Sequence, residues 1–412
     1  MGGAIAQRQG APADWRVHDE TGENACQTDG AMAPPLAAEV PILLYMPAFH
    51  GGGAENALVR LANHWHAQGR KVTIIVNAVR GPVVEKVVPG VEIVALGSRF
   101  TALAWPRLGM LLRRRRPAFL ATALLGPNVA GLWAARLWSP CTAVACLVRN
   151  HTTREIAGRD RLRRALFPPL LRAAYRRADG VGCVAGDVAQ DIIAYAALSP
   201  ERVMTTLNPV PFPETEPFPQ TGREHEPDLS GDWPPSGPVI VAMGRMVAQK
   251  DYPTLLRAFA RLEGAPHLLI LGEGPLRAEL EALCLSLGIA GRVHMPGFRN
   301  RPEACLARAD LFVLSSRFEG FPNVIAEALA LGRTVVATDA PGGGAEILGS
   351  GAFGHLVPVG DVAALARAMA RALADPVDPA RARERARDFA IEAVSRRYEA
   401  LFARAMEHRR NG

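Results

Sequence analysis

The sequence predicts an α/β protein with two doubly wound, Rossmann-like parallel sheets that face each other across a cleft. From residue 41 onward, short apolar runs alternate with helix-length amphipathic segments, which is typical of βαβ construction. A break of nine prolines in the 31 residues 208–238 interrupts this alternation, which then restarts. The length of 412 residues also suits two domains of ordinary size.

The first half of the alternation predicts a domain over residues 41–207, preceded by a poorly ordered tail over residues 1–40. Its helices are expected at 54–68, 107–116 and 187–197. Its strands are expected at 42–46, 72–77, 91–96, 119–123, 143–148, 180–185 and 203–207.

The second half predicts a domain over residues 239–378, reached through a Pro-rich linker over 208–238. Its strands are expected at 239–243, 268–271, 293–295, 311–315, 335–338 and 355–357. Its helices are expected at 252–262, 275–287, 302–309, 323–331 and 362–374. Residues 379–412 are rich in Arg, Glu and Ala and are expected to form a helical segment that packs on either domain.

Basic residues are distributed unevenly. The chain holds 47 Lys and Arg against 40 Asp and Glu, and residues 99–179 alone hold 16 Arg, no Lys and three acids. Such a block suits a nucleic acid, a membrane surface or an anionic substrate. Nucleic acid is least favoured, because few aromatic side chains are interleaved with the arginines between residues 149 and 177. We expect contact with an anionic membrane surface, although a solvated basic helix would give the same pattern.

The sequence shows no targeting signal, which favours a cytoplasmic protein, peripheral at the inner face of the membrane. The six cysteines form no C-x-x-C pair, so neither a metal cluster nor a disulfide framework is expected. Residues 1–40 lack the basic start and apolar block of a signal peptide. No run reaches the ~18–20 apolar residues that a membrane span requires.

Three consecutive glycines, Gly51, Gly52 and Gly53, follow the first expected strand and open the first helix. Glycines at this place let the backbone approach a phosphate or sugar closely, and the helix N-terminus supplies N–H groups. A tight strand-to-helix turn would also explain them.

A second cluster, Gly244, Arg245 and Lys250, follows the first strand of the second domain. Arg245 offers a planar fork and Lys250 a compact charge, which together suit a diphosphate. The chain has three Lys against 44 Arg, so a Lys at this position indicates a demand for an ammonium group. A solvated surface pair is the alternative.

Two carboxylates, Glu319 and Glu327, flank a strand-to-helix junction. The amides of the first helical turn would face an anion between them, with the helix dipole adding to the attraction. This order of a carboxylate, an anion-binding helix start and a second carboxylate matches the order of sugar, diphosphate and ribose in a nucleotide-sugar. The junction residues expected to take part are Gly320, Phe321, Asn323 and Val324.

These motifs resemble the retaining glycosyltransferases of family 4, which have the GT-B fold of two Rossmann-like domains. The resemblance covers residues 238–374 throughout and is weaker in the first domain, where it rests on residues 51–55 and His151. In the second domain it rests on Glu319 with Glu327, Gly244-Arg245 with Lys250, Leu271-Gly272-Glu273-Gly274-Pro275, His294 to Phe298, and Thr338 to Glu346.

The resemblance implies retaining transfer of a hexosyl or N-acetylhexosaminyl group from a nucleotide-sugar, with UDP-sugars favoured, to a glycan or lipid-linked acceptor. Glu327 would bind the donor ribose, Glu319 the transferred sugar, and Arg245 with Lys250 the diphosphate. His151 would contact the donor sugar, and the backbone at Phe298 would meet the base. Glycines 51–53 would lie beside the diphosphate and the acceptor.

No D-x-D pair occurs in the chain, so no metal site is predicted, and no cofactor is expected. Arg245 and Lys250 would then supply the counter-charge for the departing diphosphate. No residue stands out as an enzyme nucleophile. We therefore hypothesise front-face displacement, in which the donor's own diphosphate accepts the proton of the acceptor hydroxyl.

Two other functions fit parts of the sequence. A nucleotide-sugar epimerase of the same fold would change the sugar without an acceptor. A nucleic-acid-binding protein would use the basic block, and its binding would depend steeply on salt.

Overall fold

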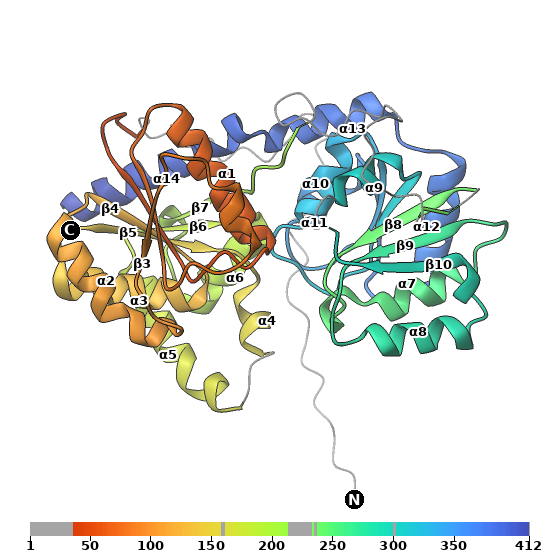
Figure 1. Cartoon of the computed structure of the whole chain (residues 1–412), viewed down its shortest axis with the longest axis horizontal. Coiled ribbons are helices and arrows are strands. Elements are labelled where there is room, and N and C mark those ends of the chain that lie inside the picture. The colour runs from red at the N-terminus through yellow and green to blue at the C-terminus, as the bar shows by residue number, and fades with distance from the viewer. Residues whose placement is uncertain (1–35, 158–160, 213–232, 235–236, 300–301, 412) are drawn as a thin grey trace, which may run out of the picture. The chain divides into compact units, whose positions relative to one another are not determined.

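The computed structural model describes residues 36–157, 161–212, 233–234, 237–299 and 302–411, without the side chains of 161–166. Residues 33–412 form one compact unit that holds two parallel β-sheets (Figure 1). The thirteen predicted strands are all present, so the two doubly wound sheets are confirmed. Most of the expected tail and most of the expected linker lie outside the described residues.

The first sheet has the strand order β3-β2-β1-β4-β5-β6-β7, and every neighbouring pair is parallel. Winding starts at β1, runs outward to β3, and then resumes on the other side of β1 with β4. The strands are β1 (Ile42–Met46), β2 (Val72–Val76), β3 (Glu92–Ala95), β4 (Phe119–Ala123), β5 (Ala143–Val148), β6 (Gly180–Cys183) and β7 (Val203–Thr205).

The helices of this half differ from the expected ranges at α2, and α3, α4 and α5 lie outside those ranges. The helix α2 begins at Thr101 rather than at residue 107, because it accommodates Pro106 in its interior. The helix α3 was not predicted, since it is buried on most sides and so lacks the polar face of an amphipathic helix. The helices are α1 (Gly53–Ala67), α2 (Thr101–Arg115), α3 (Leu125–Trp138), α4 (Thr152–Ala157), α5 (Arg161–Arg177) and α6 (Gly186–Ala196), with short 3-10 turns η1 (Pro82–Lys86) and η2 (Pro200–Arg202).

The second sheet has the order β10-β9-β8-β11-β12-β13, again wholly parallel. Its strands are β8 (Val239–Met243), β9 (His267–Leu271), β10 (Val293–Gly297), β11 (Leu311–Leu314), β12 (Thr334–Thr338) and β13 (His355–Val357). Its helices are α7 (Tyr252–Phe259), α8 (Arg277–Ser286), α9 (Pro302–Arg308), α10 (Asn323–Ala330), α11 (Gly344–Ile347) and α12 (Val362–Ala374), with 3-10 turns η3 (Ala248–Lys250), η4 (Ala290–Arg292) and η5 (Gly349–Gly351).

Alternation along β8 explains why this sheet has helices on both faces. Ile240 and Ala242 belong to one buried cluster, with residues of α7, α8 and α12. Val239, Val241 and Met243 belong to another, with residues of α9, α10 and α13 (Pro379–Ala386). Because successive side chains of a strand point to opposite faces, a strand that is apolar throughout is buried on both.

The C-terminal segment packs on the first sheet. After the 3-10 turn η6 (Arg387–Phe389), the helix α14 (Ile391–Asn411) lies against β4, β5 and β6, as Figure 1 shows in blue. A Cβ at Gly182 of β6 would lie 2.6 Å from a methyl carbon of Leu401, so glycine permits this close approach.

No helix within the described ranges is long and apolar enough to cross a bilayer.

Glu399 anchors α14 to α1 and to the turn that follows it. Its Oε1 accepts from the Trp65 indole N–H at 2.9 Å, and its Oε2 accepts from Arg70 at 3.0 Å. We expect Glu399→Ala to lower the free energy of unfolding by about 3–5 kcal/mol, because it leaves the mostly buried Arg70 guanidinium without a carboxylate, with only the carbonyls of residues 36 and 37 as acceptors. The exposed Glu392 on the same helix is the matched control, and Glu392→Ala should change stability by less than about 0.5 kcal/mol. Urea unfolding followed by circular dichroism measures both; equal values would refute the anchor.

Candidate active site

The structure brings Lys250 and Glu319 together as an ion pair. Lys250 ends the turn η3 after β8, and Glu319 lies in the loop between β11 and α10. The Lys250 Nζ is 2.6 Å from Glu319 Oε1, which also accepts a 2.6 Å hydrogen bond from the Ser316 hydroxyl. The two side chains are 17% and 12% exposed. An ammonium and a carboxylate are therefore held in contact in a site that is largely screened from water.

This pair spans the point where the winding of the second sheet reverses. β8 and β11 are neighbours in the sheet, although β9 and β10 separate them in the chain. In open parallel sheets, ligands bind beyond the carboxyl ends of the strands at such a reversal. β1 and β4 form the equivalent point of the first sheet, and the predicted glycines 51–53 follow β1. Both predicted clusters thus occupy the ligand positions of this architecture.

Gly244 leaves room for the Lys250 stem. A Cβ there would lie 2.8 Å from the Lys250 Cε, and the backbone has a φ of +147°. The Gly244 carbonyl oxygen accepts from the Tyr252 hydroxyl at 3.0 Å, and a Cβ at Gly272 would overlap that oxygen. Arg245, next in the chain, is exposed. The loop therefore fixes the lysine and presents the arginine to solvent.

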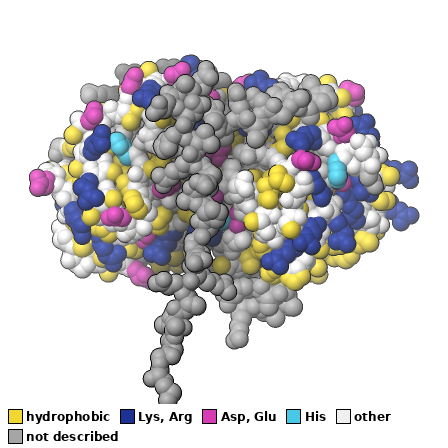
Figure 2. Space-filling view, turned by 180° about the vertical axis from the view of Figure 1, so that it is seen from behind, with side chains coloured by type: hydrophobic (Ala, Val, Ile, Leu, Met, Phe, Trp, Pro, Cys, Tyr) yellow, Lys and Arg dark blue, Asp and Glu magenta, His cyan; other side chains and the backbone are white. Residues whose placement is uncertain are grey.

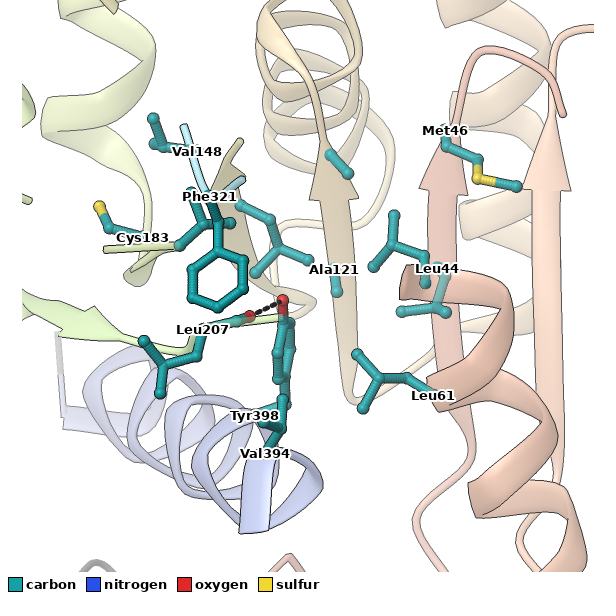
Figure 3. Packing of buried hydrophobic residues seen from close by; sticks show 14 of the residues in the cluster. Leu44, Met46, Leu61, Ala121, Val148, Cys183, Leu207, Phe321, Val394 and Tyr398 are labelled. Atoms are coloured by element: carbon teal, nitrogen blue, oxygen red, sulfur yellow. Dashed lines mark hydrogen bonds between the residues drawn. The ribbon is translucent and has the colours of Figure 1, made fainter. Parts of the chain in front are cut away.

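The start of α10 carries the remaining residues predicted in this domain. Asn323 N donates to the Phe321 carbonyl at 2.9 Å, so this amide is engaged within the loop instead of facing a ligand. The Phe321 ring is buried beside Val148 and Leu207, as Figure 3 shows. Val324 is half-buried, and Glu327 lies half-buried one turn further along α10.

A buried polar chain joins loops of the two sheets. Arg149, directly after β5, donates to Asn208 Oδ1, and Asn208 Nδ2 donates to Asn323 Oδ1 at 2.8 Å. Asn323 Nδ2 in turn donates to the Gly53 carbonyl at 3.2 Å. The side chain of Asn323 thus ties α10 to the glycine loop, a role that the sequence did not predict.

Gly320 permits a second close approach between the two halves. A Cβ at this position would overlap the carbonyl oxygen of Arg149. Its own carbonyl accepts from Gly343 N at 2.8 Å, in the loop between β12 and α11. Glycine is therefore required here for packing, whether or not its backbone meets a ligand. Gly51 and Gly52 are exposed, and Asn56 Nδ2 donates to both of their carbonyls.

His151 lies between two aspartates of α6. Its Nδ1 is 3.2 Å from Asp191 Oδ1, and its Nε2 is 3.7 Å from Asp187 Oδ2. Burial raises the pKa of Asp191, but hydrogen bonds from His151 and Thr153 outweigh it, so this pKa is held below its ordinary value. The imidazole is 13% exposed.

Three acidic residues of this region were not predicted. Asp187 Oδ2 accepts from Gly342 N at 2.7 Å, and Glu346 Oε2 accepts from Gly186 N at 2.7 Å. These bonds join the start of α6 to the loop and helix after β12. Glu346 belongs to one of the family-like motifs, whereas Asp187 and Asp191 gave no signal beyond their spacing of four residues on a helix.

Phe298 is exposed at the end of β10, with 66% of its surface accessible. The preceding Gly297 has a φ of +87°, and its carbonyl accepts from Gly272 N at 2.9 Å. This turn leaves the Phe298 backbone at the carboxyl edge of the second sheet, three strands along from β11.

Two family models match the chain, one to each half. The model described as "Glycosyltransferase Family 4" matches residues 51–212, and the model described as "Glycosyl transferases group 1" matches residues 230–389.

Curated relatives agree with the family models. The chain is 30% identical to a lipopolysaccharide core biosynthesis glycosyltransferase of Rhizobium meliloti, over 85% of this chain and 96% of the relative. Over 29% of this chain and 33% of the relative, it is 42% identical to a Campylobacter jejuni enzyme. That enzyme is an N-acetylgalactosamine-N,N'-diacetylbacillosaminyl-diphospho-undecaprenol 4-alpha-N-acetylgalactosaminyltransferase.

Solved structures share the fold. Anabaena HepE in complex with UDP-glucose matches with a TM-score of 0.72 at 18% identity, covering 87% of this chain and 97% of HepE. The lipopolysaccharide glycosyltransferase WaaG matches with a TM-score of 0.62 at 16% identity, covering 90% of this chain and 100% of WaaG.

Proposed function

The chain belongs to the family 4 glycosyltransferases and has their GT-B fold, and from this premise we propose that it transfers a sugar from a nucleotide-sugar to a lipid-linked glycan with retention of configuration. We favour UDP-sugars as donors and glycan biosynthesis as the setting. The mostly buried Lys250–Glu319 pair at the winding reversal carries this proposal. The UDP-glucose complex of HepE, which shares the fold, supports the choice of donor.

Five of the predicted donor residues have roles that suit their surroundings. Lys250, oriented by Glu319, faces the diphosphate together with the exposed Arg245. Glu319 also accepts hydrogen bonds from the hydroxyls of the transferred sugar, and Glu327 accepts from the ribose. Cations fixed beside a leaving diphosphate stabilise the charge that develops as the glycosidic bond breaks. The backbone at Phe298 meets the base.

The transfer proceeds by front-face displacement. The bond between the anomeric carbon and the diphosphate oxygen breaks, and its electron pair leaves with the diphosphate. The acceptor oxygen forms a bond to the same face of that carbon, and its proton passes to the departing diphosphate. Arg245 and Lys250 provide the counter-charge in place of a metal, since the chain has no D-x-D pair. Trapping of a sugar on an enzyme carboxylate would overturn this mechanism.

One assay tests the reaction. Purified protein is incubated with a panel of UDP- and GDP-sugars and a membrane lipid extract, and nucleotide release and product mass are measured. Glycosyl transfer predicts acceptor-dependent nucleotide release and a lipid-linked product heavier by one sugar residue. A changed sugar in the absence of acceptor would instead identify an epimerase, and neither outcome with any donor would refute the proposal.

An apolar and basic surface on α2 supports a lipid-linked acceptor. Phe100 and Leu103 are 65% and 66% exposed. Met110, seven residues after Leu103, is also exposed and lies on the same helix face as Leu103. Asn77 Nδ2 donates to the Thr101 hydroxyl at 2.9 Å, which places the start of α2 at the carboxyl end of β2. The helix ends with exposed arginines at 113–115, of which Arg115 is paired with Glu92. An apolar stripe that continues into cations suits an anionic bilayer.

Figure 2 shows one face of the molecule, on which dark blue Lys and Arg side chains gather most densely in the right-hand part. The side chains of residues 158–166, which belong to the predicted basic block, lie outside the described residues. The surface proposed here therefore rests on α2.

We expect the protein to sediment with anionic liposomes and to sediment much less with neutral ones. The double change Phe100→Ser and Leu103→Ser should reduce the bound fraction several-fold, because both side chains are exposed on the membrane-facing stripe. Leu285→Ser, at a 72% exposed leucine of α8, is the matched control and should leave binding unchanged. Equal sedimentation with both liposome types, or an unaffected double variant, would contradict the surface.

A further inference from the structure

The environment of His151 fixes where its ring proton lies. The Thr153 hydroxyl donates to Asp191 Oδ1 at 2.6 Å, and the Thr153 backbone N–H donates to Asp191 Oδ2 at 3.1 Å. Both carboxylate oxygens are thus oriented by one residue of α4. The Asp191 side chain is only 4% exposed, so solvent does not compete for it.

The hydroxyl of Thr153 has one hydrogen, and Asp191 receives it. Toward His151 Nδ1, at 3.2 Å, the Thr153 oxygen is therefore an acceptor. Asp191 Oδ1, also 3.2 Å from Nδ1, is an acceptor as well. A ring nitrogen that faces two acceptors must carry the proton.

We propose that Asp191 is a positioning residue, which together with Thr153 selects the Nδ1–H tautomer in the neutral form of His151 and leaves Nε2 as the accepting nitrogen. This inference rests on the proposed function and deepens it: Nε2 then accepts a hydrogen bond from a hydroxyl of the donor sugar. A donor lacking that hydroxyl would be used less well.

The opposite side of the ring fits this assignment. Asp187 Oδ2 lies 3.7 Å from Nε2, beyond hydrogen-bond distance, and instead accepts from Gly342 N at 2.7 Å. Gly342 is close to Glu319, because a Cβ there would overlap the Glu319 carbonyl oxygen. Nε2 is thus on the side of the ring toward the Glu319 loop, where the proposed sugar site lies. Asp191 is on the other side, where it can orient the ring without touching the sugar.

Nitrogen-15 NMR of protein labelled at its histidines reads the tautomer directly. At a pH where imidazoles are neutral, the two ring nitrogens have distinct shifts that report which one carries the proton, and His151→Gln assigns the signal. We expect Nδ1–H in the wild type. Asp191→Asn keeps an oxygen acceptor and should retain that tautomer, whereas Asp191→Ala should lose it. Asp187→Asn, one turn earlier on α6, should leave it unchanged.

Kinetics give the second readout. Asp191→Ala should lower kcat/KM for the donor by about tenfold to a hundredfold, the range seen when the residue that orients a metal-bound histidine is removed. Asp191→Asn should recover much of this loss, which a merely structural role would not predict. An Nε2–H wild type, or an unchanged tautomer in Asp191→Ala, would overturn the inference. The NMR result does not depend on transfer, so an inactive wild type would refute the proposed function alone. Should Asp191→Ala fail to fold, the wild-type spectrum still decides.

Discussion

Lys250→Ala is expected to lower the rate of sugar transfer by about a hundredfold, the range seen when one preorganised charge-stabilising group is removed. The ammonium is held 2.6 Å from Glu319 in a site that is mostly buried, so no solvent cation replaces it in a fixed position. The loss also leaves the Glu319 carboxylate facing the donor without its partner, which adds repulsion toward the diphosphate. Initial rates at saturating donor measure the effect.

Two variants sharpen this prediction. Lys250→Arg should restore little activity, because Gly244 is shaped around the slender lysine stem and a guanidinium is wider. Lys71→Ala removes an exposed lysine at the far end of β2 and should leave the rate unchanged. Near-normal transfer by a folded Lys250→Ala protein would refute the assignment of the diphosphate site.

Glu327→Ala is expected to act mainly on donor affinity. A hydrogen bond to a charged group contributes about 1.5–3 kcal/mol, and about 1.4 kcal/mol corresponds to a factor of ten. We therefore expect the KM for the donor to rise about tenfold or more, with a smaller change in kcat, because the ribose is remote from the bond that breaks. Competition by the free nucleotide should weaken in parallel.

The matched control for Glu327 is Glu279, an exposed glutamate on α8 of the same domain. Glu279→Ala should leave both KM and kcat unchanged. A Glu327→Ala protein with wild-type donor KM would remove Glu327 from the donor site while leaving the Lys250–Glu319 pair as proposed.

Elements whose own residue pattern indicates burial could be predicted. Strand β8 is a continuous apolar run and β4 is apolar except for Thr122, and the bounds of both match the prediction. The helix α3 escaped prediction because it contains Gly126 and Pro127 and is buried on most sides. The position of α14 depends on Gly182, whose missing side chain leaves room for Leu401. These residues are more than two hundred positions apart, so the local sequence pattern does not indicate the contact.

The candidate site divides in the same way. Lys250 and Glu319 were each predicted from loops after neighbouring strands, but their direct pairing follows from the order of the sheet. Asn323 was predicted for its backbone, whereas its side chain links Asn208 to Gly53. Asp191 could not be predicted, since an aspartate inside a helix gives no sign of the histidine that the loop after β5 brings beside it.

The most direct test of the proposed site is a transfer reaction run in excess chelator, with the anomeric configuration of the product determined by proton NMR. If Arg245 and Lys250 carry the diphosphate charge and displacement is front-face, an α-linked donor yields an α-linked product at an undiminished rate. A β-linked product, or a reaction that stops with the chelator and resumes with added divalent metal, would contradict it.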